Sequence, residues 1–292
     1  MRRNWIGQDL VGHASFRRVS ASLFSVLFPS DCRICGEPLL NVSRLPVCPP
    51  CLDQIHAIRG AVCSVCGERV LSSFAEHDPD GWRRCPVCRR LERPFERAIA
   101  YGSYEGGLRE LVYLLKFDGV RPAAGVLGRM LAESIAELSP AFEQATVLVI
   151  PVPLFQGKRH RRGFNQADLI AKAALKCLAA SERLQLRTEI LQRTRDTHSQ
   201  IGLTSHQRRE NLRGAFNVAR AAEVTGREIL LVDDVYTTGT TASECARVLV
   251  RAGAAKVWVA TAARTLKLAS QYAEVGLDEA GYELALPKAV GS

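Results

Sequence analysis

The stretch ILLVDDVYTTGTT, residues 229–241, decides the fold. Its first four residues form a continuous apolar run, which is typical of a strand buried on both faces of a parallel sheet. Asp233 and Asp234 follow at the carboxyl end of this strand, the edge at which open α/β sheets hold ligands. Apolar residues with helical spacing resume at 242–250, so the residues between strand and helix form a turn.

That turn is rich in hydroxyl groups: it contains Thr237, Thr238, Gly239, Thr240 and Thr241. The N-terminus of a helix has unpaired backbone N–H groups and a partial positive charge, which suit a phosphate. The Gly-Lys-Ser/Thr ending of a P-loop and the three glycines of a dinucleotide site are both absent. The pattern therefore favours a ligand with a phosphate and neighbouring hydroxyls over an ordinary strand-turn-helix with capping threonines.

This segment resembles the signature of type I phosphoribosyltransferases, which bind 5-phosphoribosyl 1-diphosphate (PRPP). The resemblance implies that Asp233 and Asp234 contact the ribose, influence a bound Mg²⁺ and are catalytic. It also implies that residues 237–241 hold the 5′-phosphate.

The composition is that of a folded protein, with 47% hydrophobic and 24% charged residues in 292. No apolar run approaches the roughly 20 residues of a membrane span, so we expect no membrane insertion. The basic start of the chain contains an acid, and no small-residue cleavage site follows the apolar segment 22–28. These features favour a cytoplasmic location over a targeting peptide. Oligomeric state is not indicated by the sequence.

Eight of the ten cysteines form four C-x-x-C pairs in the first 88 residues. Two such pairs complete a tetrahedral site of four sulfurs, which suits structural zinc. Four pairs predict two zinc ions, and we prefer sequential pairing over crossed pairing because the intervening loops are ordinary for zinc ribbons. A thioredoxin-like redox motif is the alternative, but it predicts one pair rather than four. The predicted ligands are Cys32, Cys35, Cys48, Cys51, Cys63, Cys66, Cys85 and Cys88. We interpret Cys177 and Cys245 as buried small hydrophobes on helices.

The remaining sequence alternates strand and helix patterns, which predicts an α/β fold with a mainly parallel sheet flanked by helices. We place a domain boundary near Pro94, giving an N-terminal extension with a double zinc ribbon at 1–93 and a second domain at 94–292. Beyond the central strand, we predict strands over 98–104, 146–154 and 255–264 and helices over 108–119 and 122–138. Lys116 could reach a phosphate, although we favour a solvated lysine at a helix end. The tail 266–292 is not assigned.

A basic segment follows the strand at 146–154. It reads as a loop carrying Lys158, Arg159, His160, Arg161 and Arg162, closed by Gly163 and Asn165 before a helix. Because this charge lies directly after a core strand, we favour contact with a diphosphate over a solvated surface run.

The combination of the cysteine pairs with LKFDG, PVPL and RRGFNQA resembles the ComF family of competence-associated proteins. These proteins join a zinc module to a phosphoribosyltransferase-like domain. A further family block at 193–216 includes Gln200, Arg208 and Asn211, and its polar composition predicts a flap over the site. His198 and His206 lie in this block, but we interpret them as ordinary loop histidines.

Two functions remain open from the sequence. The favoured one is a phosphoribosyltransferase that uses Mg²⁺ and PRPP, with an acceptor that the sequence does not identify. The alternative is a non-catalytic protein that handles single-stranded DNA together with the DNA-uptake machinery. The arginine-rich segments suit the alternative. Against it, the formal charge of +4 on residues 1–97 is cancelled when eight thiolates bind two zinc ions.

Overall fold

The computed structural model describes residues 31–39, 43–70, 83–179, 181–197 and 205–266. The chain divides into two compact units, Met1–Ile55 and His56–Ser292. The second group of cysteines therefore lies in the larger unit. The domain boundary near Pro94 stays a prediction.

The described part of the first unit is a small cysteine-bearing fold. The turn at Cys32–Gly36 is closed by the bridge between Asp31 and Pro38, and one short helix, α2 (Pro49–Asp53), follows Cys48. Proline at the first helical position suits the helix start because its missing N–H has no intrahelical partner there. Leu45 and Val47 are buried beside the cysteines and supply a minimal core.

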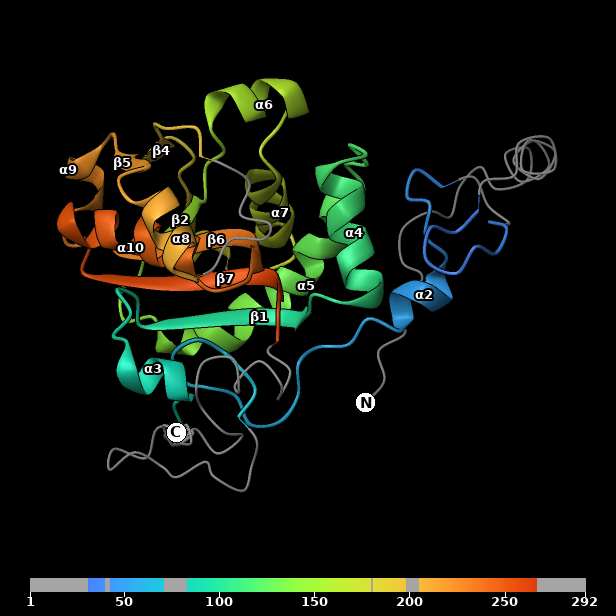
Figure 1. Ribbon diagram of the computed structural model, residues 1–292, viewed down its shortest axis with the longest axis horizontal. Helices are drawn as coiled ribbons and strands as arrows, with labels where there is room; N and C mark the ends of the chain where they lie inside the picture. The colour runs from blue at the N-terminus through green and yellow to red at the C-terminus, as the bar shows by residue number, and fades with distance from the viewer. Residues whose placement is uncertain (1–30, 40–42, 71–82, 180, 198–204, 267–292) are drawn as a thin grey trace, which may run out of the picture. The chain divides into compact units, whose positions relative to one another are not determined.

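The larger unit is built on a five-stranded sheet in the order β1-β7-β6-β2-β3, with all neighbouring pairs parallel (Figure 1). The strands are β1 (Arg97–Ser103), β2 (Val147–Pro151), β3 (Leu184–Leu186), β6 (Glu228–Tyr236) and β7 (Lys256–Arg264). Every residue of β2 is buried, as are all of β7 after its first residue. Burial on both faces explains the continuous apolar runs in the sequence. The predicted α/β fold with a mainly parallel sheet is confirmed.

Helices cover this sheet. The long ones are α4 (Gly106–Lys116), α5 (Ala123–Leu138), α7 (Gln166–Leu175) and α10 (Thr240–Arg251). Helix α5 packs against β1 and β7, α7 packs against β2 and β6, and α10 packs against β6 and β7. Gly128 allows α5 and α7 to approach closely, because a Cβ at this position would overlap Ala173. The helices predicted at 108–119 and 122–138 are therefore present as α4 and α5.

The second group of cysteines is part of the core of the larger unit. Cys63, Cys66, Cys85 and Cys88 belong to the same buried cluster as Val257, Val259, Ala246 and Leu249. The short helix α3 (Pro86–Arg90) carries Cys88. Backbone hydrogen bonds also join this module to the sheet, since the Ala98 N–H donates to the Val65 carbonyl at 2.7 Å. The second group of cysteines therefore packs against the sheet and shares its buried core, as the helices do.

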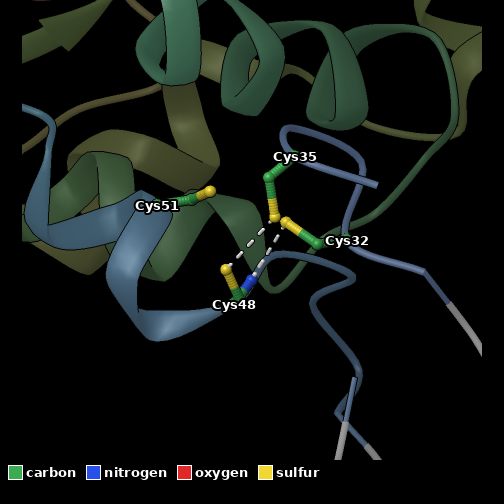
Figure 2. A group of neighbouring side chains, drawn as sticks. All are labelled: Cys32, Cys35, Cys48 and Cys51. Atoms are coloured by element: carbon green, nitrogen blue, oxygen red, sulfur yellow. Dashed lines mark hydrogen bonds between the residues drawn. The ribbon is translucent and has the colours of Figure 1, made fainter. Parts of the chain in front are cut away.

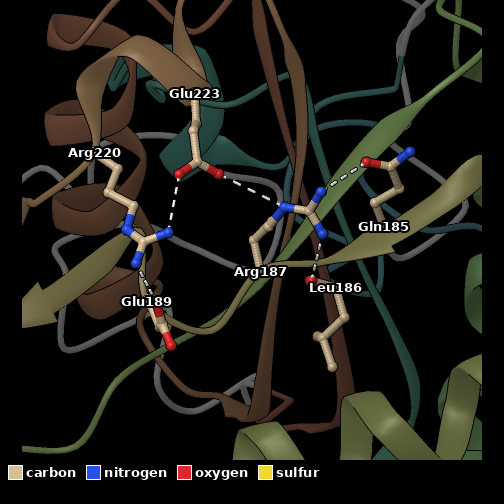
Figure 3. A network of polar contacts seen from close by, with 6 residues as sticks. All are labelled: Gln185, Leu186, Arg187, Glu189, Arg220 and Glu223. Carbon is tan, nitrogen blue, oxygen red and sulfur yellow. Dashed lines mark hydrogen bonds and ion pairs between the residues drawn. The ribbon is translucent and has the colours of Figure 1, made fainter.

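A smaller antiparallel pair and several short helices complete the described fold. They are β4 (Leu191–Arg193), β5 (Phe216–Val218), α6 (Gln156–Arg162), α8 (Ser205–Leu212) and α9 (Ala221–Val224), with 3-10 turns at Ser139–Ala141 and Ser181–Arg183. Charged side chains tie the β3–β4 connection to α9 (Figure 3). The Glu223 carboxylate forms ion pairs with Arg187 at 3.6 Å and with Arg220 at 3.2 Å, and Arg220 also pairs with Glu189. These pairs are largely exposed, so each contributes little to stability.

Two local predictions are wrong. The basic segment predicted as a loop is the helix α6, which ends at Gly163 in the left-handed conformation with φ 77°. Arg159, Arg161 and Arg162 lie in its last turn, where the helix dipole favours positive charge. Cys177 is exposed rather than buried, because α7 ends at Leu175 and the helical pattern does not extend to it. Cys245 is fully buried as predicted.

Candidate functional site

The acid pair lies near the carboxyl end of β6. The Asp234 backbone N–H donates to the Asp233 carboxylate at 2.9 Å, so the first acid is oriented by the second residue's backbone. Asp234 is 3% exposed, and its carboxylate pairs with the Lys116 ammonium at 2.9 Å. Lys116 therefore is not the solvated lysine that we favoured from the sequence. Instead, α4 supplies a counter-ion to the acid pair.

Burial and charge alter the titration of these groups. Burial and the neighbouring charge of Asp234 raise the pKa of Asp233 to about 7, although Lys116 and Arg193 act in the opposite direction. Burial alone would lower the pKa of Lys116, but pairing with Asp234 outweighs it and the pKa is raised. Lys116 thus stays charged, whereas Asp233 can take up a proton near neutral pH.

Residues 237–241, which follow β6, are called the phosphate loop after the 5′-phosphate that the sequence resemblance assigns to them. Gly239 is the N-cap of α10 in the left-handed conformation, with φ 74°. A Cβ at this position would overlap the hydroxyl of Tyr236, so the ring of the last strand residue lies directly against the loop. The hydroxyls of Thr238 and Thr240 lie 2.7 Å apart, and Thr237 is exposed. Gly239 has no side chain with which to cap α10, and the helix dipole places a partial positive charge at this end of the helix.

Helix α6 brings cations towards the same edge of the sheet. Burial lowers the pKa of Arg162, and the charge of Asp234 opposes that effect, which indicates that the two groups are within electrostatic reach. The Arg162 guanidinium donates to Gln166 at 2.5 Å and lies 5.9 Å from the ring centroid of Phe117. Arg161 is exposed. Asn165 caps α7 by accepting from the Ala167 N–H at 3.2 Å.

The block at 193–216 approaches the site through Arg193, Asp196 and Thr197. Lys158 of α6 pairs with Asp196 at 3.0 Å and donates to the Thr197 carbonyl at 2.9 Å. Burial lowers the pKa of Arg193, while the nearby carboxylate of Asp233 acts against it. Gln200 lies outside the described residues, as do His198 and the rest of 198–204 in the predicted flap. Arg208 and His206 lie on α8, whose side chains at these positions are not described, and Asn211 is half-buried.

A cavity of about 780 Å³ lies on one side of the phosphate loop. Thr237, Thr238 and Thr240 line it, together with Arg247 of α10 and Cys66 of the cysteine module. Its lining does not include the acid pair or the cations of α6. This cavity and the acid pair are therefore two distinct features of the described residues, and both border the turn at 237–241.

The eight paired cysteines form two clusters, each with four sulfurs within 4.8 Å of one another. Figure 2 shows the first cluster, in which the Cys35 and Cys48 sulfurs lie 3.7 Å apart and the Cys48 N–H donates to the Cys32 sulfur at 3.3 Å. In the second cluster the Cys66 and Cys85 sulfurs lie 3.7 Å apart. Four thiolates at this spacing fit tetrahedral zinc, and backbone N–H donation stabilises their charge. The preferred sequential pairing is confirmed.

Sequence reasoning missed three contributors to the site. Lys116 was considered but interpreted as solvated, although its place one residue before the aromatic of LKFDG was a usable signal. Arg193 and Tyr236 were not considered as site residues. Tyr236 lies two residues after Asp234 in a segment that we assigned to the turn, whereas the strand continues through it.

In the part of the chain that the structure describes, no helix has the length and apolar character needed to cross a membrane. Residues 23–89 match the double zinc ribbon domain family, which accounts for two Cys₄ zinc-binding sites.

Comparisons over the whole chain give a consistent set of relatives. DNA utilization protein YhgH of Escherichia coli O157:H7 is 34% identical over 82% of this chain and 98% of its own length. Competence protein F of Haemophilus influenzae is 30% identical over 75% of this chain and 91% of its own. Competence protein ComFC of Bacillus subtilis is 26% identical over 72% and 80%. Among solved structures, a glutamine PRPP amidotransferase from B. subtilis aligns at a TM-score of 0.31 and 21% identity, covering 48% of this chain and 26% of that chain.

Proposed function

This chain belongs to the ComF family, which includes competence protein F and DNA utilization protein YhgH, and on that premise we propose that it binds Mg²⁺ and PRPP at the carboxyl end of β6. We further propose that it transfers the phosphoribosyl group to an acceptor and releases diphosphate. The cytoplasmic location expected from the sequence is part of this proposal.

The observation that carries the proposal is the juxtaposition of Asp233 and Asp234 with the phosphate loop on one strand end. The acids suit vicinal ribose hydroxyls, because a carboxylate accepts two or more hydrogen bonds. The loop supplies threonine hydroxyls and the N–H groups of a helix start, which suit a phosphate. A sugar phosphate carries a phosphate and vicinal hydroxyls close together, and few other ligands do.

The described residues fit a magnesium ion as well as a sugar. Mg²⁺ prefers oxygen ligands and is usually held by one or two carboxylates and substrate phosphates. Asp233 would supply such an oxygen, whereas the Asp234 carboxylate already pairs with the Lys116 ammonium at 2.9 Å. When bound, Mg²⁺ would neutralise diphosphate charge and so make diphosphate a better leaving group.

The roles of the protein's own groups follow from the charge of the reaction. Departure of diphosphate from the anomeric carbon concentrates negative charge on the leaving group, so Arg161 and Arg162, ending at Gly163, would stabilise it. Asp233 and Asp234 would orient the ribose, and the phosphate loop would anchor its 5′-phosphate. The segment 193–211, with Gln200, Arg208 and Asn211, would exclude water and protect PRPP from hydrolysis. Asn165 would act indirectly, by fixing the start of α7 beside Gly163.

The experiment is incubation of the zinc-loaded protein with Mg²⁺ and PRPP and a panel of purines, pyrimidines and amines, with diphosphate release as the readout. We expect release that depends on one acceptor class and is lost in the Asp233→Asn/Asp234→Asn variant. Release that is equal in the variant would refute the assignment of these carboxylates. Binding of PRPP without release for any acceptor would leave a binding protein rather than a transferase.

A second candidate function is the handling of single-stranded DNA, which the names of the relatives favour. An aromatic pair supports it: Tyr113 and Phe117 are 45% and 62% exposed, and their ring centroids lie 4.9 Å apart. Exposed aromatic rings beside cations such as Arg162 are suited to stacking bases and contacting phosphates. Binding of a fluorescent oligonucleotide that weakens with salt and is competed by PRPP would support a shared site. Absent or salt-insensitive binding would contradict it.

A further inference from the structure

One buried arginine joins the second cysteine cluster to the end of the central sheet. Arg264 is the last residue of β7 and is 2% exposed. Its guanidinium donates to the backbone carbonyl of Cys66 and to the carboxylate of Glu68, the latter at 2.7 Å. Glu68 is 4% exposed. A buried ion pair of this kind holds its two elements in one geometry, because separating them would leave two uncompensated charges out of water.

The same guanidinium contacts the residue beneath the phosphate loop. It lies 5.1 Å from the ring centroid of Tyr236, within the range of a cation–π contact. The Thr265 N–H donates to the Tyr236 carbonyl at 2.9 Å, which fixes the backbone of the same residue. On another side, the ring of Phe95 meets Tyr236 edge to face at 6.5 Å. The Tyr236 hydroxyl in turn lies against Gly239, so a shift of the ring would displace the loop.

A separate contact reaches the first turn of α10. Arg93, five residues after the zinc ligand Cys88, donates to the Ser243 hydroxyl at 3.3 Å. The Ser243 N–H donates to the Gly239 carbonyl at 2.8 Å. The cysteine module therefore contacts the phosphate loop and the helix start by two routes. The first unit, with Cys32, Cys35, Cys48 and Cys51, forms a separate compact unit.

We infer that Arg264 and Tyr236 are positioning residues that couple zinc at the second cluster to the geometry of the phosphate loop. The inference deepens the proposed function, because it concerns the loop to which that function assigns the 5′-phosphate. Zinc fixes the turn that presents the Cys66 carbonyl and Glu68. Without the metal, four thiol groups packed within 4.8 Å have no common ligand to hold them. The turn then loosens, Arg264 loses its partners, and Tyr236 no longer supports Gly239.

The test measures the loop directly, by hydrogen exchange and mass spectrometry on peptides that cover 233–243 in the full chain without ligand. Glu68→Gln is the central variant, because it weakens the Arg264 contact and removes no cysteine. Glu92→Gln, an exposed glutamate that lines the same cavity, is the matched control. We expect Glu68→Gln to retain two zinc ions per chain and to speed exchange in the loop about tenfold, the effect of one weakened charged hydrogen bond. The control should exchange as the wild type does.

A metal-removal arm separates the two zinc sites. Cys66→Ser and Cys35→Ser should each lose one zinc ion by elemental analysis, but only Cys66→Ser should speed exchange in the loop. Unchanged exchange in Glu68→Gln would overturn the coupling, and so would an equal effect of Cys35→Ser. If Cys66→Ser does not fold, Glu68→Gln and Glu92→Gln still decide the question.

A failure of the coupling between zinc and the loop can be distinguished from a failure of the proposed function. Exchange in the loop is measured without PRPP, so it reports the coupling even if PRPP does not bind. Calorimetric titration of Mg²⁺ and PRPP into the wild-type protein tests the function separately. If the wild-type protein binds, we expect Glu68→Gln to bind about tenfold more weakly, since the same contact orders the loop that holds the phosphate.

Discussion

Replacing Gly239 with alanine tests the geometry of the phosphate loop most sharply. The residue has φ 74°, and a side chain in the left-handed region costs about 1–2 kcal/mol. A Cβ would also overlap the Tyr236 hydroxyl, and the nearby ring atoms are part of a buried side chain that cannot swing into solvent. Forcing an extra methyl group into such packing costs about 1–3 kcal/mol. The expected loss of unfolding free energy is therefore about 2–5 kcal/mol, the sum of these two ranges.

The chain offers a matched control for the backbone contribution. Gly226 has φ 70°, and a Cβ there meets nothing within 4 Å. Gly226→Ala should therefore lose only about 1–2 kcal/mol. Urea denaturation of both zinc-loaded variants gives the two free energies, and their difference isolates the overlap with Tyr236. If the two variants lose the same unfolding free energy, Tyr236 does not support the loop, and its role as a positioning residue is contradicted.

Three further predictions concern the charges and the metals. Burial raises the pKa of Asp233 to about 7, so protons compete with a bound cation below that pH. Calorimetry should therefore show Mg²⁺ binding about tenfold weaker at pH 6 than at pH 8. An Mg²⁺ affinity that is independent of pH would contradict a role for Asp233. Lys116→Met leaves the Asp234 carboxylate buried without its partner and should lower unfolding free energy by about 1–3 kcal/mol in urea denaturation, with part of the loss restored by MgCl₂. Its control Lys172→Met, from an exposed pair, should change stability by less than about 0.5 kcal/mol, and equal losses would refute the special role of Lys116. Elemental analysis should find two zinc ions per chain. Outside the clusters, a thiol reagent added to the native protein should react rapidly with the exposed Cys177 and not with the buried Cys245.

Much of the fold could be predicted from the sequence because its strands are buried on both faces. Runs such as 229–232 and 147–151 have no polar side chain, as is typical of a strand buried on both faces of a parallel sheet. The sequential pairing of the cysteines could be preferred because the loops that it requires are of ordinary length for zinc ribbons. By contrast, the helical state of 156–162 was missed, since a run of charges has no apolar periodicity from which a helix can be inferred.

The contacts within the site were less accessible to sequence reasoning because they join distant parts of the chain. Lys116 and Asp234 are 118 positions apart, and Glu68 and Arg264 are 196 apart, so no local pattern relates them. They come together through the sheet order, in which β7 lies between β1 and β6. The acid pair and the phosphate loop could be identified because their chemistry is contiguous in the sequence.

The most direct test of the account is a calorimetric titration of Mg²⁺ and PRPP into the wild-type protein and into Asp233→Asn/Asp234→Asn. We predict saturable binding to the wild-type protein and no measurable binding to the variant, with the zinc content and urea midpoint of the variant showing that it is folded. Wild-type affinity in the folded variant would contradict the claim that these carboxylates hold the sugar.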